Sequence, residues 1–139
     1  MNEQEWRLFA LQPGRNAIFT SVRPDGRPHA VPVWFDFDGD DIVITSGDAT
    51  VKAKNVAAGS AVAICIDDQT YPYGFVLIEG DAVIETLSPE DLLPYAIRCA
   101  ERYVPDGQAE AYGKRNAVEG EILIRVTLNK VLAWKDMSA

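Results

Sequence analysis

Apolar and polar residues alternate along most of the chain, and short clusters of turn residues interrupt the alternation. Apolar, β-branched segments with a two-residue period are typical of strands buried on one face. The pattern predicts six strands, at residues 16–22, 29–37, 42–45, 61–67, 75–85 and 121–134. Because Pro24-Asp25-Gly26 and Asp38-Gly39-Asp40 are typical tight-turn sequences, we expect the first three strands to form an antiparallel meander.

Helical periods occur between and beside these strands. The predicted helices cover residues 3–11, 48–57, 88–103 and 107–117. Pro94 fits the third helix badly, because an interior proline removes a hydrogen-bond donor and clashes with the preceding turn. That helix should therefore kink at Pro94 or begin after it. Since hairpin turns connect the early strands, a doubly wound parallel sheet is not expected. The elements predict a small, mainly β barrel of the α+β type with a few short flanking helices.

Length and charge narrow the classes of function. A chain of 139 residues, 47% of them hydrophobic, is the size of one domain, so residues 1–139 are expected to form a single unit. The formal net charge of -8 is unfavourable for nucleic acid and for anionic membranes, because both are bound by clustered Lys and Arg. Residues 1–5 are acidic and no long apolar run follows, which indicates a cytoplasmic protein.

Most catalytic and metal-binding signatures are absent from the sequence. His29 is the only histidine, and Cys65 and Cys99 are too far apart for a zinc knuckle or a redox dithiol. There is no P-loop, nucleophile elbow or HExxH motif. We expect His29 to be an ordinary rim residue and both cysteines to be core residues, with no metal site and no catalytic side chain.

One segment carries the chemistry of an anion site. Residues 45–55 lead from a strand end into a helix start, where free backbone N–H groups and the helix dipole favour an anion. Ser46 and Thr50 add hydroxyl groups, and Lys52 and Lys54 add positive charge. A solvated helix face is the alternative interpretation. Because residues two apart do not share a helix face, at most one lysine should point at a phosphate.

A second segment, His29 to Phe35, offers a surface for a ring system. Pro32 inside a strand implies a missing ladder bond, hence a sheet edge or a place where something else packs. Trp34 has a flat face that could contact a ring. A core or interface aromatic is the alternative interpretation of Trp34.

These segments together resemble a known family. In their order and spacing, several segments resemble those of the pyridoxamine 5'-phosphate oxidase-like, FMN-binding split-barrel superfamily. The resemblance is to the branch that uses the deazaflavin coenzyme F420 in particular. The segments are residues 17–35, 50–55, 79–82, 101–103, 121–126 and 131–134. The resemblance implies a six-stranded antiparallel split β-barrel and a homodimer with cofactor sites at its interface. It implies cofactor contacts from Pro32, Val33, Trp34, Ser46, Thr50, Lys52, Lys54 and Asn55.

The resemblance also implies a function. Pyridoxamine-phosphate oxidase carries an Arg and a Lys on the strand that corresponds to residues 29–34, where this chain has His29 and Trp34. Its basic C-terminal substrate motif is also absent, so vitamin B6 oxidation is not expected. The expected function is an F420-dependent reductase of a conjugated small organic molecule, which needs no acid–base residue because the cofactor carries the chemistry. An FMN-dependent redox protein and a non-catalytic cofactor binder are the alternatives.

Overall fold

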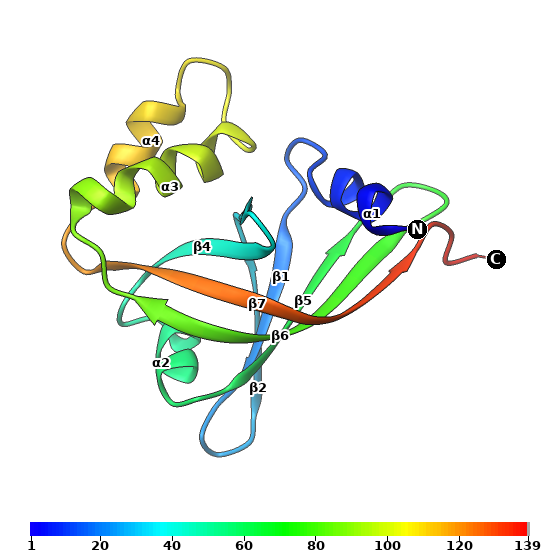
Figure 1. Ribbon diagram of the computed structural model, residues 1–139, viewed down its shortest axis with the longest axis horizontal. Coiled ribbons are helices and arrows are strands. Elements are labelled where there is room, and N and C mark those ends of the chain that lie inside the picture. Colours follow the sequence, from blue (N-terminus) through cyan, green and yellow to red (C-terminus); the bar gives the residue numbers. More distant parts are fainter. Residues whose placement is uncertain (139) are drawn as a thin grey trace.

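The computed structural model of the chain describes residues 1–138 (Figure 1). Its helices are α1 (Glu3–Ala10), α2 (Val51–Ala57), α3 (Pro89–Glu101) and α4 (Ala109–Asn116). Its strands are β1 (Ala17–Val22), β2 (Pro28–Val33), β3 (Asp36–Asp38), β4 (Asp41–Gly47), β5 (Ala61–Asp67), β6 (Phe75–Glu85) and β7 (Glu121–Trp134).

All seven strands belong to one antiparallel sheet in the order β2-β1-β5-β6-β7-β4-β3. β2 and β3 lie at opposite edges of this order, yet only Trp34 and Phe35 separate them in sequence. The sheet must therefore curl until its two edges meet. This arrangement confirms the mainly β, antiparallel split barrel with short flanking helices.

The strand expected at residues 29–37 is divided, so the expected count of six strands is one too low. Its first half pairs with β1 and its second half pairs with β4. The two hairpins therefore lie at opposite edges of the sheet and do not form a continuous meander. The apolar pattern is unbroken from Val31 to Phe37, because both halves have a buried face, and it does not reveal the change of partner.

The interior of the barrel holds the main core. Inward-facing residues of every strand meet there, with Phe19, Phe35, Ile44, Ile64, Ile78 and Ile124 fully buried. A smaller apolar cluster lies on the other face of β4 and β7, where Val43 and Leu123 pack against Leu92 and Ala96 of α3. This second cluster explains why β4 and β7 each bury three residues in succession.

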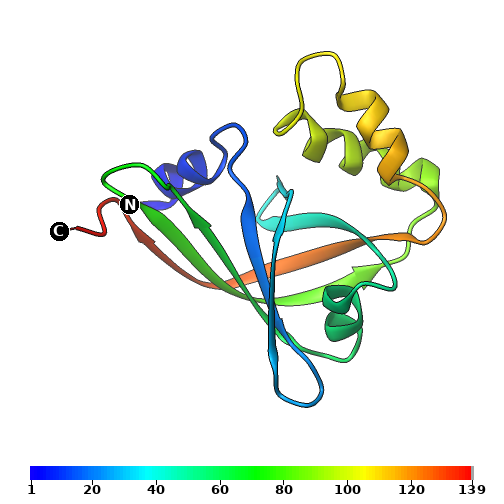
Figure 2. The same cartoon turned by 180° about the vertical axis from the view of Figure 1, so that it is seen from behind.

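The helices α3 and α4 lie side by side beyond one end of the sheet (Figure 2). α3 continues through Pro94 from Pro89 to Glu101, and Ser88 caps its first turn by accepting from the Asp91 N–H at 3.1 Å. The two helices approach closely at Gly113, where an added Cβ would lie 3.0 Å from the backbone of Ile97. None of the helices within residues 1–138 is both long enough and apolar enough to cross a membrane.

The two cysteines occupy different environments. Cys99 is buried in α3, as expected, and its burial raises the pKa of its thiol to about 12. Cys65 is only half-buried, because the inward positions of β5 are Val62, Ile64 and Ile66. Cys65 therefore lies on the outer face of the sheet, and its expected place in the core is wrong.

Candidate functional site

A cavity of about 370 Å³ opens where the two edges of the sheet meet. Residues of β2, β4, α2, α4 and β7 border it. Its walls are formed by Pro32, Val33, Trp34, Thr45, Ser46, Gly47, Lys52, Asn116 and Glu121. The cavity thus combines the two segments that the sequence marked separately, because β4 crosses the end of β2 where the barrel closes.

The aromatic wall of the cavity is held by the end of α3. Trp34 and Phe35 cross between β2 and β3 without belonging to either strand. The Phe35 N–H donates to the Tyr103 hydroxyl at 3.4 Å, and the Phe35 carbonyl accepts from Arg102 at 2.5 Å. The Tyr103 ring stacks on Trp34, with ring centroids 5.2 Å apart and planes 4° from parallel. The Tyr103 ring therefore covers one face of Trp34 and fixes the orientation of its ring.

Lys52 and Glu121 bring opposite charges to the same cavity. Burial lowers the pKa of Lys52, and Glu121 opposes that shift. Burial likewise raises the pKa of Glu121; Lys52 opposes this rise, and the nearby Asp48 adds to it. Desolvation is the larger effect at both groups, and within the described residues no ion pair closer than 4 Å joins them. Each charge is consequently poorly compensated, which is typical of functional sites.

The hydroxyl groups of Ser46 and Thr50 are already used within the protein. Thr50 is the N-cap of α2, and its Oγ1 accepts from the Ala53 N–H at 3.3 Å. The same oxygen lies 3.0 Å from the Gly47 carbonyl and 2.9 Å from Ser46 Oγ. Ser46 lines the cavity and Thr50 stands behind it, so Thr50 supports the wall of the cavity.

Lys54 and Asn55 do not reach the cavity. Lys54 is exposed on another side of α2, as the two-residue spacing from Lys52 requires. Asn55 is buried and donates from Nδ2 to Ser21 Oγ at 3.0 Å, which fastens α2 to β1. Of the eight residues expected at the cofactor, the cavity wall gathers Pro32, Val33, Trp34, Ser46 and Lys52.

Sequence reasoning missed several wall residues. Glu121 lies directly opposite Gly47 in the pairing of β4 with β7, and Asn116 ends α4. Tyr112 of α4 also approaches Trp34, at 6.2 Å between ring centroids. Asn116 and Tyr112 belong to no local motif. Glu121 begins one of the segments that resemble the family, residues 121–126, but its place on the cavity wall follows from the register of β4 with β7.

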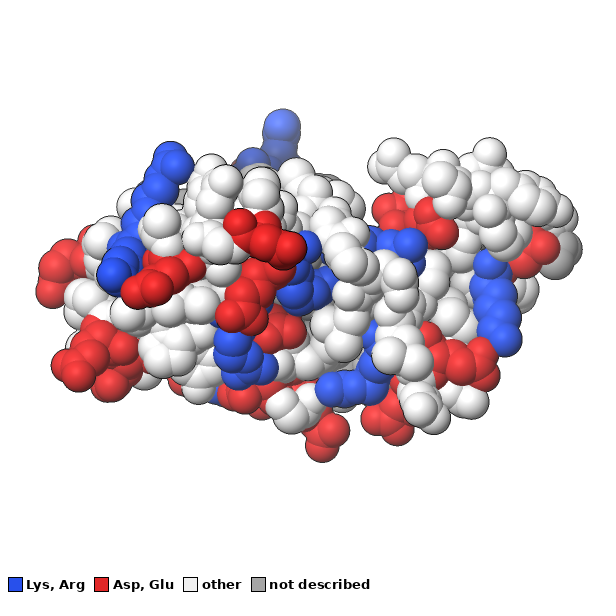
Figure 3. Space-filling view, turned by 90° about the horizontal axis from the view of Figure 1, so that it is seen from above, with Lys and Arg blue, Asp and Glu red and all other residues white. Residues whose placement is uncertain are grey.

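The donor set fits a phosphorylated aromatic ligand. One cation, Lys52, and an apolar wall of Pro32, Val33 and Trp34 face one cavity. Elsewhere basic and acidic side chains are interspersed, as Figure 3 shows for one face of the molecule. A flavin or deazaflavin phosphate requires a cation for the phosphate and a flat surface for the ring. The residues present supply both, although Glu121 adds an unexpected negative charge.

Comparisons with known proteins identify the family to which the sequence is similar. The sequence profile of the family described as pyridoxamine 5'-phosphate oxidase matches residues 3–135. A search of curated proteins gave no significant match.

Solved structures share the fold at low sequence identity. A conserved hypothetical protein from Mycobacterium tuberculosis is 24% identical with a TM-score of 0.80, covering 96% of this chain and 84% of its own. An F420 reductase is 24% identical with a TM-score of 0.68, covering 89% and 94%. The heme storage protein HutZ from Vibrio cholerae is 15% identical with a TM-score of 0.71, covering 94% and 92%. At these identities the similarity establishes the fold, and proteins of different functions share it.

Proposed function

Because the chain belongs to the pyridoxamine 5'-phosphate oxidase family, we propose that it is an oxidoreductase that uses coenzyme F420 to reduce a conjugated small organic molecule. The observation that carries the proposal is the cavity at the closure of the barrel, where Lys52 and an aromatic wall face the same space. The similarity to an F420 reductase supports the choice of cofactor. A cytoplasmic location stays a prediction.

The residues of the cavity have separate tasks in this proposal. When bound, reduced F420 supplies the hydride, and the protein supplies orientation and a dry surface. Lys52 binds the phosphate, and the wall from Pro32 to Trp34 lies along the ring system. Tyr103 and Arg102 position that wall by binding Trp34 and the Phe35 backbone. No acid–base residue is assigned to the hydride transfer.

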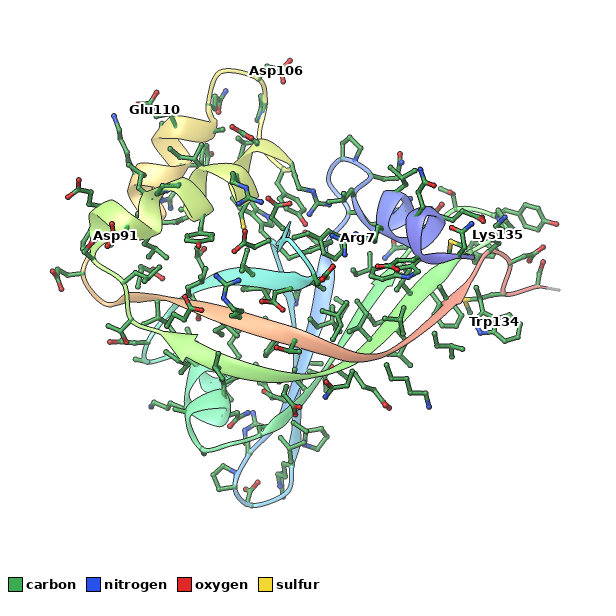
Figure 4. All side chains as sticks on the ribbon, in the orientation of Figure 1. Arg7, Asp91, Asp106, Glu110, Trp134 and Lys135 are labelled. Atoms are coloured by element: carbon green, nitrogen blue, oxygen red, sulfur yellow. The ribbon has the colours of Figure 1, made fainter. Side chains whose placement is uncertain are left out.

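The outer face of the sheet supports a homodimer. Register brings five apolar residues into one row across β2, β1, β5, β6 and β7; they are Pro32, Ile18, Cys65, Leu77 and Leu132. Leu132 is 44% exposed and Trp134 is 50% exposed, and Figure 4 shows Trp134 projecting away from the sheet at the end of β7. Since Pro32 belongs both to this row and to the cavity wall, a second copy on this face would complete the cofactor site.

The dimer can be tested with a charge placed in this row. Leu132→Glu should give a monomer in sedimentation velocity at micromolar concentration and should lose most of its cofactor affinity. Val83→Glu is the matched control, because Val83 is 56% exposed on β6 outside the row. A wild-type monomer that retains bound cofactor would refute the shared site.

The cofactor is tested by titrating the protein with F420 and with FMN under identical conditions, with tryptophan fluorescence as the readout. Trp34→Phe separates quenching at the cavity from quenching at Trp6 and Trp134. We expect F420 to bind more tightly. FMN binding tenfold tighter than F420 would instead favour the FMN-dependent redox protein.

Catalysis is tested separately from binding. The protein loaded with reduced F420 is mixed in a stopped-flow instrument with a panel of conjugated carbonyl and quinone compounds. If the protein is an oxidoreductase, at least one compound should oxidise the protein-bound reduced F420 faster than it oxidises free reduced F420. Equal rates across the panel would favour the non-catalytic cofactor binder.

A further inference from the structure

Glu121 is the one carboxylate on the wall of the cavity, and the proposed function does not use it. It begins β7 opposite Gly47, which has no side chain to separate it from the cavity. Within residues 1–138 its carboxylate makes no ion pair closer than 4 Å. A carboxylate in this position is held near the place where Lys52 would receive a phosphate.

We propose that Glu121 determines specificity for the phosphate group of the cofactor, admitting a monoanionic phosphodiester and disfavouring a dianionic phosphomonoester. The inference rests on the proposed function, because it places the phosphate at Lys52. F420 carries its phosphate as a diester with one negative charge. FMN carries a monoester that is close to doubly charged at pH 8, since its second pKa is about 6.

Coulomb's law gives this selection a definite form. The repulsion between Glu121 and a phosphate is proportional to the charge on the phosphate. The free-energy penalty for a dianion is therefore twice the penalty for a monoanion, and the corresponding factor in the dissociation constant is squared. Lys52 attracts the dianion by the same rule, so Glu121 offsets part of the advantage that Lys52 alone would give FMN.

Desolvation strengthens the selection. Burial raises the pKa of Glu121, which shows that its charge is incompletely hydrated in the cavity. A charge in such a place is screened less than one on the open surface. The negative charge of Asp48 also raises the pKa of Glu121, because a second negative charge nearby is unfavourable.

The test uses three flavins with one ring system and different phosphate charges: riboflavin, the phosphate methyl ester of FMN, and FMN. Dissociation constants are measured at pH 8 and low salt by tryptophan quenching, with nuclear magnetic resonance for weak binding. In Glu121→Gln, riboflavin should bind unchanged, the methyl ester about threefold more tightly, and FMN about tenfold more tightly. The preference for F420 over FMN should fall accordingly.

The control is Glu119→Gln, which removes the same charge from an exposed residue outside the cavity. It should shift all three constants by less than twofold. The inference is overturned if Glu121→Gln increases the affinity for FMN no more than the affinity for the methyl ester, or if no phosphorylated flavin binds more tightly. Circular dichroism and thermal unfolding establish that the variant is folded.

A further variant separates this inference from the proposed function. Lys52→Gln should weaken the binding of FMN relative to the binding of riboflavin. If it does so while Glu121→Gln has no effect, the phosphate site stands and the role of Glu121 falls. If Lys52→Gln leaves the ratio of FMN to riboflavin unchanged, the phosphate does not bind at Lys52 and the proposed function fails with it.

Discussion

Replacing Lys52 with methionine should separate the stability of the protein from its ability to bind a cofactor. Methionine keeps the length and apolar stem of the side chain while removing its charge. A charge-assisted hydrogen bond to phosphate contributes about 1.5–3 kcal/mol. The dissociation constant for the cofactor should therefore rise by about 10-fold to 150-fold.

The effect of the same change on folding should have the opposite sign. Burial lowers the pKa of Lys52, so its charged form is less favourable in the folded protein than in the unfolded chain. This charge opposes folding with its full effect below the lowered pKa, and the opposition disappears as the pH rises from that lowered value to the ordinary pKa of 10.5. Since Lys52 is half-buried, Lys52→Met should raise the free energy of unfolding by at most about 1 kcal/mol at pH 7.

Urea denaturation gives the stability, and tryptophan quenching at low salt gives the cofactor affinity. Lys54→Met is the matched control, because it removes the same charge from the exposed side of the same helix. The control should change the affinity by less than threefold. An unchanged dissociation constant for Lys52→Met would refute the phosphate role, and a loss of more than about 1 kcal/mol of stability would refute the argument from desolvation.

Two further predictions concern the framework. Arg125 donates to Glu85 at 2.5 Å and to Asp38 at 2.9 Å, so Arg125→Met should lower the free energy of unfolding by about 2 kcal/mol at pH 7. The hydrogen bond from Arg125 lowers the pKa of Asp38, so it stabilises the fold above the ordinary pKa of 3.8, and this stabilisation is lost as the pH falls through the lowered pKa. In urea denaturation, the loss of stability caused by Arg125→Met should therefore become smaller below about pH 4. Gly113→Ala should force α4 away from the Ile97 backbone and reduce stability by about 1–3 kcal/mol in thermal unfolding, and an unchanged melting temperature would contradict the observed close packing.

The sequence predicts elements well where one strand has one partner. β5 and β7 have the expected bounds, 61–67 and 121–134, because alternation on a single sheet is a local property. It does not predict the break at Trp34, since the change of partner from β1 to β4 leaves the apolar pattern intact. Where β2 ends and β3 begins therefore depends on which strands they pair with across the barrel.

The candidate site divides in the same way. Lys52 and Trp34 could be selected locally, because a cation near a helix start and an aromatic residue two positions after a proline are visible in a short window. Thr50 was expected at the phosphate for the same reason, but an N-cap hydroxyl is already bound to its own helix. Glu121 could not be predicted from its neighbours, since its place in the cavity follows from pairing with Gly47.

The position of the cavity follows from the connection that closes the barrel. Trp34 and Phe35 link β2 to β3 and form no strand hydrogen bonds of their own. The backbone between β2 and β3 leaves the sheet at Phe35, and buried backbone groups need partners. Arg102 and Tyr103 supply those partners from the end of α3, and the same tyrosine stacks on Trp34. The contacts that close the barrel therefore also position the aromatic wall of the cavity. A change that loosens the end of α3 would disturb fold and ligand site together, whereas Lys52 and Glu121 lie outside these closing contacts and can vary with little effect on the fold.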